Sequence, residues 1–377
     1  MDDLDPILTD TLRPDLPPPP PVEEIRARGR HIRRRRQIAY TAASVAAIVL
    51  VVGTGMALQS WMVDNDVVVD PVGPDTPTGD APAGDDPSKV DASEATGPEP
   101  SQREGVALPA GDLIVHQRAF DIYAVTLEGE EIPIFQAPTI EVSPDVSPDG
   151  QRILFSSGDG DNFDLFVMAI DGTDVTQLTD TPTDPEFEAR WSPDGTRIVY
   201  MRRNVAEERS EIWTMRADGS GQTALYTDAD ASLVPTWSPD GSAIAFTSYV
   251  GESFDVWIMD ADGSDARRVT DLPNDEWNSV WSPDGRFLTF SAHPDGGDRD
   301  LYVVEVESGE VSLLLDTELD ATGPMWHPNG TRLAYELNRQ IWLVAVSATG
   351  SGFEVGDPVR VTTSPEQHGA PTWRVGG

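Results

Sequence analysis

The chain has 377 residues, enough for about two domains, and it carries a formal net charge of −39 and no cysteine. The absence of cysteine excludes disulfide bonds and a lipid-modified cysteine anchor, so an exported domain would depend on its core alone. The negative charge disfavours binding to nucleic acid and to anionic surfaces.

Residues 1–36 are predicted to form a disordered tail in the cytoplasm. The tail contains the proline run Pro17–Pro21, which cannot join a helix or a sheet core. It ends in a group of arginines at positions 26, 28, 30 and 33–36. Arginines beside an apolar segment set membrane topology and can touch anionic headgroups. We prefer this interpretation to a contact with nucleic acid or with a regulator.

Residues 37–62 are predicted to form a single transmembrane helix. No charged residue occurs from Gln37 to Val63, and Ile38–Leu58 alone gives 21 mostly apolar residues, about the length that spans a bilayer. The arginines before this segment place the N-terminus inside and the rest of the chain outside the cell membrane. A cleaved signal peptide is the alternative. The long leader, the long apolar run and the lack of a convincing cleavage site disfavour it.

Residues 63–104 are predicted to form an acidic, proline-rich linker. Their composition, rich in Pro, Asp, Gly, Thr and Ala, cannot bury a core. We interpret the segment as a spacer between the membrane and the next domain. Residues 105–377 carry a net charge of −31. This charge would attract cations or basic partners, although solubility or a saline environment also accounts for it.

From residue 146 onward, a five-residue motif returns at a regular spacing. Complete copies of Trp-Ser-Pro-Asp-Gly occur at Trp191–Gly195, Trp237–Gly241 and Trp281–Gly285. Altered copies occur at Val146–Gly150, Trp326–Gly330 and Trp373–Gly377. Their first residues lie 45, 46, 44, 45 and 47 positions apart. A spacing this regular indicates a repeat architecture.

Each copy predicts a strand that ends at the Trp position, a tight turn and a second strand. In the turn, Pro fixes φ, Asp bonds its own backbone and Gly supplies a positive φ. An apolar run such as Ile153–Phe155 follows and is typical of a buried strand. A third strand begins with a polar, an aliphatic and an aromatic residue, at Asp121, Asp164, Glu211, Asp255, Asp300 and Gln340. A turn glycine and a short fourth strand come next.

Four short strands in about 45 residues are typical of a β-propeller blade. The third-strand motif at Asp121 has no five-residue motif before it, and the copy at Trp373 has no strands after it. We therefore predict an all-β, six-bladed β-propeller over residues 105–377. A strand from about 368–376 would become the innermost strand of a blade whose other strands come from about 112–137. This closure would cover strand edges that otherwise invite aggregation.

The repeated string and its spacing resemble the WD40-like (PD40) repeat of the TolB propeller family, over about residues 105–377. The resemblance implies a bacterial cell-envelope propeller that binds other proteins, as the TolB propeller docks an envelope lipoprotein. The α/β domain that precedes the propeller in that family has no counterpart here, where the predicted span and linker stand instead. We interpret the Trp, turn and aromatic positions as packing and turn residues.

The sequence gives little sign of catalysis. It has no Gly-x-Ser-x-Gly elbow, no phosphate loop and no His-Glu-x-x-His motif, and we predict no catalytic residue, cofactor or metal. We expect His327 to be a surface turn residue and His368 to lie on the rim. The Asp-rich stretches Asp159–Asp164 and Asp260–Asp265 do not match a calcium loop.

Loops that join the fourth strand of one blade to the first strand of the next all emerge on one face of a propeller. Carboxylates on these loops would focus a negative potential at that face. We expect the face to bind a basic peptide or cations, and a solvated acidic rim is the alternative. The predicted rim residues are Asp184, Glu186, Glu188, Asp228, Asp230, Asp275, Glu276, Asp320 and Glu366.

The predicted function is a non-catalytic platform for protein or peptide binding in the cell envelope, held in the cell membrane by one span. Two alternatives stay open: a metal-dependent propeller hydrolase with a site in the channel, and an envelope sensor that signals through the cytoplasmic tail. The sequence identifies neither the partner nor the oligomeric state, because a fold does not by itself name a function.

Overall fold

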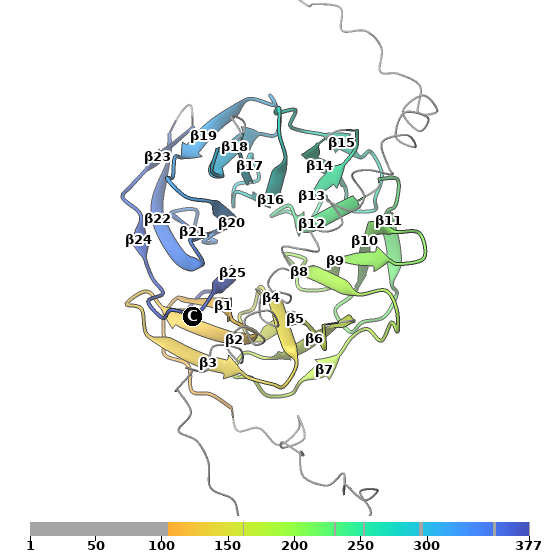
Figure 1. Cartoon of the computed structure of the whole chain (residues 1–377), viewed down its shortest axis with the longest axis vertical. Coiled ribbons are helices and arrows are strands. Elements are labelled where there is room, and N and C mark those ends of the chain that lie inside the picture. The colour runs from red at the N-terminus through yellow and green to blue at the C-terminus, as the bar shows by residue number, and fades with distance from the viewer. Residues whose placement is uncertain are drawn as a thin grey trace, which may run out of the picture. The chain divides into compact units, whose positions relative to one another are not determined.

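The computed structural model describes residues 105–376, apart from residues 161, 230, 252, 294–296 and 350–351. The predicted tail (1–36), transmembrane helix (37–62) and linker (63–104) lie outside these described residues. Within the described residues, no helix is long and apolar enough to cross a membrane. The described part of the chain consists of β-strands joined by turns and loops, arranged as a β-propeller (Figure 1).

Two sheets hold the strands nearest the start of the described chain. The first has the order β25-β1-β2-β3 and contains β1 (Leu113–Arg118), β2 (Asp121–Thr126), β3 (Glu131–Phe135) and β25 (His368–Arg374). The second runs in sequence order and contains β4 (Ile140–Val146), β5 (Arg152–Gly158), β6 (Phe163–Ala169) and β7 (Thr176–Gln177).

The next sheet has eight strands and consists of two antiparallel meanders. One meander contains β8 (Glu186–Trp191), β9 (Arg197–Asn204), β10 (Arg209–Arg216) and β11 (Thr223–Tyr226). The other contains β12 (Ala231–Trp237), β13 (Ala243–Tyr249), β14 (Phe254–Asp260) and β15 (Arg267–Arg268). A single parallel pairing, Ser210 with Ala231, joins β10 to β12.

The last two sheets complete the described strands. One contains β16 (Glu276–Trp281), β17 (Phe287–Ala292), β18 (Asp300–Glu305) and β19 (Val311–Leu315). The other contains β20 (Ala321–Trp326), β21 (Arg332–Leu337), β22 (Gln340–Thr349), β23 (Gly352–Val355) and β24 (Val359–Arg360). The long strand β22 pairs with both β23 and β24.

The innermost strands lie next to one another in a closed cycle. β4 contacts β8, β8 contacts β12, β12 contacts β16, β16 contacts β20, β20 contacts β25 and β25 contacts β4. Figure 1 shows these strands around a common centre, with the remaining strands of each meander farther out. The cycle depends on β25, because this strand lies between β20 and β4.

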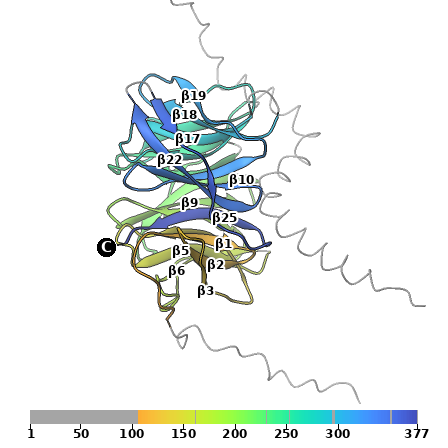
Figure 2. The same ribbon diagram turned by 90° about the vertical axis from the view of Figure 1, so that its left-hand side faces the viewer.

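Strand β25 joins the two ends of the described chain. It pairs antiparallel with β1, with Ile114 opposite Trp373 and Gln117 opposite Gly369. The two strands lie side by side in both views (Figures 1 and 2). This pairing confirms the prediction that a strand from about 368–376 completes a sheet begun at about 112–137.

The Trp-Ser-Pro-Asp-Gly copies form the tight turns predicted for them. In the copy that links β8 to β9, the Ser192 hydroxyl donates to Asp194 Oδ1 at 2.6 Å and the Gly195 N–H donates to the Ser192 carbonyl at 2.8 Å. The turn glycines of five copies have φ between +67° and +73°, a region that glycine enters without steric cost.

Each innermost strand carries a β-bulge three residues before its Trp position. The register with the neighbouring strand shifts there in β4, β8, β12, β16, β20 and β25. The residue at this position has φ between +48° and +56° in every copy: Ser143, Glu188, Val234, Asn278, Gly323 and Ala370. Such values are rare for residues other than glycine, so the bulges are a strained, repeated feature of the inner strands.

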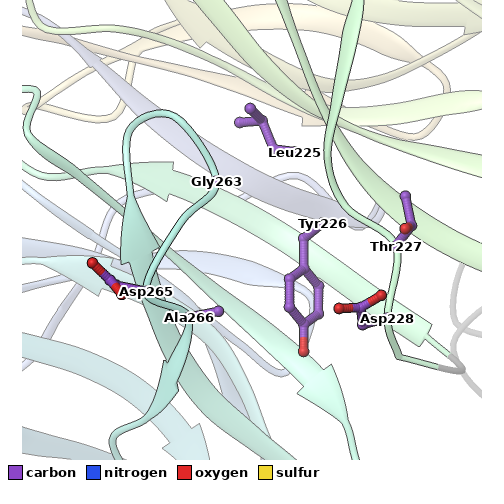
Figure 3. A pocket seen from close by; sticks show the side chains of 7 residues that line it. All are labelled: Leu225, Tyr226, Thr227, Asp228, Gly263, Asp265 and Ala266. Carbon is purple, nitrogen blue, oxygen red and sulfur yellow. The ribbon is translucent and has the colours of Figure 1, made fainter.

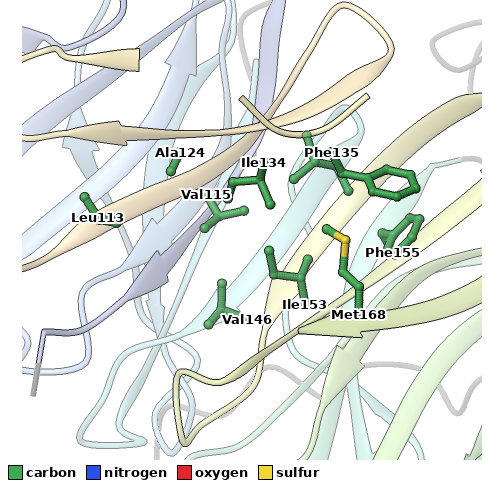
Figure 4. Close-up of a cluster of buried hydrophobic side chains, with 10 residues drawn as sticks. Leu113, Val115, Ala124, Ile134, Phe135, Val146, Ile153, Phe155 and Met168 are labelled. Atoms are coloured by element: carbon green, nitrogen blue, oxygen red, sulfur yellow. The ribbon is translucent and has the colours of Figure 1, made fainter. Parts of the chain in front are cut away.

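Hydrophobic side chains pack between neighbouring sheets. In the cluster of Figure 4, Val115 of β1 and Ile134 of β3 meet Val146, Ile153 and Met168 of the next sheet. The burial of such side chains is the main force that holds sheets together.

The Trp positions lie at the same kind of junction between sheets. The Arg152 guanidinium lies 4.5 Å from the ring centre of Trp191, and Arg197 lies 4.4 Å from that of Trp237. Both are cation–π contacts in which an arginine of one meander covers the Trp of the next.

Candidate functional site

Most of the predicted rim residues belong to loops on one face of the propeller, which we call the loop face. It is formed by the loops that lead into the innermost strands and by the loops between the second and third strands of each meander. Backbone hydrogen bonds join these two loop types: Arg203 N–H donates to Pro185 O at 2.9 Å, and Ala321 N–H donates to Arg299 O at 2.8 Å. The two loop types of this face are therefore in direct contact at these places.

Three of the predicted rim carboxylates support loops of this face. The backbone N–H of Val205 donates to Asp184 at 3.2 Å, that of Phe254 donates to Asp275 at 2.9 Å, and that of Arg299 donates to Asp320 at 2.9 Å. Asp184 also forms an ion pair with Arg202 at 2.9 Å. These carboxylates hold a neighbouring loop in place, and of the three only Asp320 is exposed.

Glu186 and Glu276 are buried and do not form part of an exposed rim. Glu186 accepts hydrogen bonds from the hydroxyls of Thr179 at 3.0 Å and Thr181 at 2.8 Å. Glu276 accepts from the Thr270 hydroxyl at 2.7 Å and from the Leu272 N–H at 3.0 Å. Burial raises the pKa of each carboxyl to about 7, because a low-dielectric environment disfavours the charged form.

Glu188 lies at the bulge of β8. Its carboxylate accepts a hydrogen bond from the Ser143 hydroxyl of the neighbouring inner strand β4 at 2.9 Å, and it lies 3.5 Å from Arg190. Glu188 therefore connects two inner strands instead of projecting from a rim loop.

Three predicted rim residues are exposed, and one lies outside the described residues. Asp228 and Glu366 are exposed, and Glu366 forms an ion pair with Arg118 at 3.0 Å. Asp230 lies outside the described residues. The structure thus leaves Asp228, Glu366 and the exposed Asp320 as the accessible carboxylates of the predicted rim.

Asp228 also lines a pocket of about 390 Å³ between β11 and the turn that joins β14 to β15 (Figure 3). The pocket lining combines an aromatic ring, a hydroxyl and two carboxylates with small apolar groups: Leu225, Tyr226, Thr227, Asp228, Gly263, Asp265 and Ala266. The sequence analysis did not predict this pocket. The sequence signal for the pocket was Tyr226, which takes the place that Thr179 and Thr270 occupy in their meanders. Each of these threonine hydroxyls donates to the first residue of the innermost strand that follows.

The histidines do not lie where the sequence predicted them. His327 was expected on the surface, and this was wrong: it is 3% exposed, and its Nε2 lies 3.1 Å from Asp112 Oδ2. His327 Nδ1 accepts from the Asn329 N–H at 3.2 Å, so the ring bonds within its own turn but differently from the serine of the other copies. His368 is fully buried beside His116 instead of exposed on the rim.

Within the described residues, no group of three or more His, Asp or Glu side chains is placed to hold a metal ion. In the stretch Asp260–Asp265, Asp262 accepts hydrogen bonds from the Ser264 N–H at 3.0 Å and from the Ser264 hydroxyl at 2.6 Å. These are the bonds of a hairpin turn.

The radial sheets, the repeated turns and the bulged inner strands define a β-propeller. The profile of the TolB beta propeller domain (PD40) matches residues 196–374. The Tol-Pal system protein TolB of Anaeromyxobacter dehalogenans is 32% identical over 110 residues, which are 29% of this chain and 24% of that protein. These matches support the resemblance to the TolB-like propeller family.

Two other relatives are described as uncharacterized. An uncharacterized protein of Agrobacterium fabrum is 28% identical over 145 residues, which are 36% of this chain and 49% of that protein. The uncharacterized peptidase YuxL of Bacillus subtilis is 28% identical over 165 residues, which are 43% of this chain and 18% of the peptidase. The matched parts of the chain thus span half or less of the length of each of these curated relatives.

Solved structures support the fold. TolB from Acinetobacter baumannii has a TM-score of 0.59 at 19% identity, covering 70% of this chain and 66% of that one. A putative TolB from Agrobacterium tumefaciens has a TM-score of 0.53 at 18% identity, covering 71% of this chain and 99% of that one. At these identities the likeness shows a shared fold and no more.

Proposed function

We propose that the chain is a membrane-anchored, six-bladed propeller that acts as a non-catalytic platform for a basic protein or peptide in the cell envelope. The uncharged stretch 37–62 with its preceding arginines supports the anchor. The closed cycle of innermost strands, from β4 through β8, β12, β16 and β20 to β25, supports six blades. The similarity to Tol-Pal system proteins supports protein binding in the envelope.

The observation that carries the proposal is the charge of the propeller together with its accessible carboxylates on the loop face. Residues 105–377 carry a net charge of −31, and Asp228, Asp320 and Glu366 are exposed on loops of that face. An acidic surface speeds the association of basic partners and gives that association a strong dependence on salt.

The first described residues lie away from this face. Val106, one of the first described residues, donates its N–H to the Asp171 carbonyl at 2.9 Å. Asp171 belongs to the turn between β6 and β7, at the end of the sheet opposite to the loop face.

A charge-reversal experiment tests the binding face. The variant Asp228→Lys, Asp320→Lys, Glu366→Lys should weaken binding of a fluorescent octa-arginine peptide by about tenfold or more at low salt, because it changes the local charge by six units. The control Glu128→Lys, Glu307→Lys, Glu354→Lys makes the same change at exposed positions away from the loop face, and we expect less than about a threefold effect. Equal losses in the two variants would show attraction by total charge and no site.

A second candidate function rests on the similarity to the peptidase YuxL. The matched segment is 18% of that protein, so the likeness concerns a part of it only. Turnover of fluorogenic proline-containing peptides by the purified full chain would favour a hydrolase. Binding of the peptides without turnover would favour the platform.

A further inference from the structure

Two histidines replace repeated residues in the sheet that contains both ends of the described chain. Strand pairing places His116 opposite Tyr123. The equivalent pairs elsewhere put a large aromatic residue at the His116 position: Phe155, Tyr200, Phe246, Phe290 and Tyr335. His368 lies five residues before Trp373, where the other copies have Glu141, Glu186, Ser232, Glu276 and Ala321. Strands β1 and β25 thus each contribute one histidine, a titratable ring, to the junction where they pair.

The two rings lie against each other in the interior. His116 and His368 are both fully buried, their ring centres are 5.0 Å apart, and their Nδ1 atoms are 3.4 Å apart. They belong to strands separated by 252 residues in the sequence. The histidine pair is therefore a direct contact across the ring closure.

The hydrogen bonds determine where the protons lie. His116 Nδ1 lies 2.9 Å from the Gln117 carbonyl oxygen, which can only accept, so this nitrogen carries the proton. His368 Nδ1 then presents a lone pair to it, and His368 Nε2–H donates to Ser364 Oγ at 2.6 Å. His116 Nε2 has no hydrogen-bond partner among the described residues. Both rings are therefore neutral in this arrangement.

A further proton would break the arrangement at either ring. On His368 Nδ1 it would turn a lone pair into an N–H that faces the N–H of His116. On His116 Nε2 it would place a positive charge at a buried atom with no acceptor, which costs several times a normal hydrogen bond.

The groups around the pair do not relieve this cost. Strand β1 contributes Arg118 and strand β2 contributes Tyr123, and the Arg118 guanidinium lies 4.7 Å from the Tyr123 ring centre. Glu131 of β3 and Glu366 of the loop before β25 are already paired with Arg118 at 3.0 Å each.

From the adjoining sheet, β21 contributes Glu336 and the turn after it contributes Arg339. The Glu336 carboxylate lies against Gly369, and the Arg339 carbonyl accepts the His368 N–H at 2.9 Å. Burial raises the pKa of Glu336 to about 7, so near neutral pH this carboxyl is partly protonated and offers little compensating charge.

We propose that the His116–His368 pair makes closure of the propeller pH-sensitive: protonation of these rings separates β25 from β1 and opens the ring at this junction. The opening requires no loss of structure in the other sheets, because their strands are consecutive in sequence and pair with one another.

The directions of the two pKa shifts agree with opening at low pH. Burial lowers the pKa of His116 to about 3 and also lowers the pKa of His368. The open state, with both rings in water, therefore binds more protons than the closed state below about pH 6.5. Closure is fully stable above that pH and weakens as the pH falls. Between pH 7.5 and 5, each histidine increases the open population by about 30-fold at most.

Hydrogen exchange of the full-length chain tests this proposal. Protection of the amides in β1 and β25, corrected for the intrinsic exchange rate, should fall between pH 7.5 and 5 by about 30-fold or more relative to β13 and β17. The double variant His116→Phe, His368→Gln should lose most of this difference. Phe is the residue that the repeat itself uses at Phe155, so it fits the available space.

Matched variants separate a specific from a general effect. His293→Gln removes a histidine from the loop after β17 and should leave the pH dependence of β1 and β25 unchanged. If the double variant does not fold, His116→Phe alone should remove the contribution of one histidine to the pH dependence of protection, which is about 30-fold at most. The proposal is overturned if β1 and β25 of the unmodified chain lose protection no faster than β13 and β17, or if the double variant keeps the full effect.

Discussion

At the scale of single residues, two of the inner strands, β8 and β16, begin with a buried carboxyl. Glu186 and Glu276 occupy equivalent positions and bond to equivalent threonines, Thr179 and Thr270. The nearest cation to Glu186 is Arg202, at 3.9 Å. Their pKa values of about 7 mean that the folded chain takes up protons where the unfolded chain would release them.

Replacing Glu186 with Gln should therefore flatten the dependence of stability on pH. The pKa of Glu186 is higher in the folded state, so its contribution is fully present below about pH 4.5 and is lost as the pH rises through 7. The loss amounts to roughly 3 kcal/mol. We expect the free energy of unfolding of the Gln variant, measured by urea titration, to show that much less decline from pH 4.5 to 8. The same decline in both proteins would contradict the burial effect.

The sequence could not show that these acids point inward. Their loop positions predicted these carboxylates at the face, and Asp228 and Glu366 are exposed. Glu186 and Glu276 instead are the first residues of β8 and β16, where the alternation of a strand turns the side chain into the interior. Thr179 and Thr270, six or seven residues earlier, were the signal, because a buried carboxylate needs a donor.

At the scale of elements, turn glycines set the distance between sheets. Gly172 lies in the turn from β6 to β7 with φ +84°, and a Cβ there would overlap the Ile134 carbonyl oxygen of the preceding sheet. Gly219 and Gly263 approach Leu178 and Leu225 in the same way, where a Cβ would lie 2.7 Å from the carbonyl oxygen. At these three junctions, one meander thus rests on the preceding meander through a glycine without a side chain.

Comparison of two alanine variants separates this contact from backbone strain. Gly309 has φ +72° but no atom within 4 Å of a Cβ position, so Gly309→Ala should cost about 1–2 kcal/mol from backbone strain alone. Gly172→Ala should cost roughly 1–3 kcal/mol more, because the sheets must move apart. Urea unfolding of both variants measures the difference. Equal costs would mean that the contact between the sheets is unimportant.

Strand positions were predicted well and strand irregularities were not. The motif period and the polar-aliphatic-aromatic pattern located the second and third strands, such as β5 and β6, because alternation and turn chemistry are local properties. The bulges at Val234 and its equivalents were missed. Valine at φ +51° opposes its own backbone preference, so only the packing of neighbouring inner strands can impose this conformation.

At the scale of the whole molecule, the closure was predictable because it follows from counting. In the sequence, the meander at about 112–137 had no first strand, and the strand at about 368–376 had no meander after it. The pairing of β25 with β1 accounts for both. The histidines at this junction were not predicted, because the contact between His116 and His368 appears only once the two ends are brought together.

A disulfide across the closure should stabilise the propeller strongly. Val115 and Thr372 are opposite each other in the β1–β25 ladder, and the chain has no other cysteine. Linking Val115→Cys to Thr372→Cys would close a loop of more than 250 residues, for which loss of unfolded-chain entropy stabilises by up to about 5 kcal/mol. Thermal unfolding of the oxidised and the reduced double variant measures the gain. No gain would contradict the stabilisation expected from restricting the unfolded chain.

The distance in sequence between β1 and β25 has a consequence during biosynthesis. At translation rates of about 5–20 residues per second, the strand that covers the inner edge of β1 reaches the exit tunnel roughly 10–50 seconds after β1 itself, given the 252 residues between His116 and His368. Throughout that interval β1 offers an open row of N–H and C=O groups. Two nascent chains on one message could exchange β25 at this stage, which would yield an intertwined dimer built from the same contacts as the closed monomer.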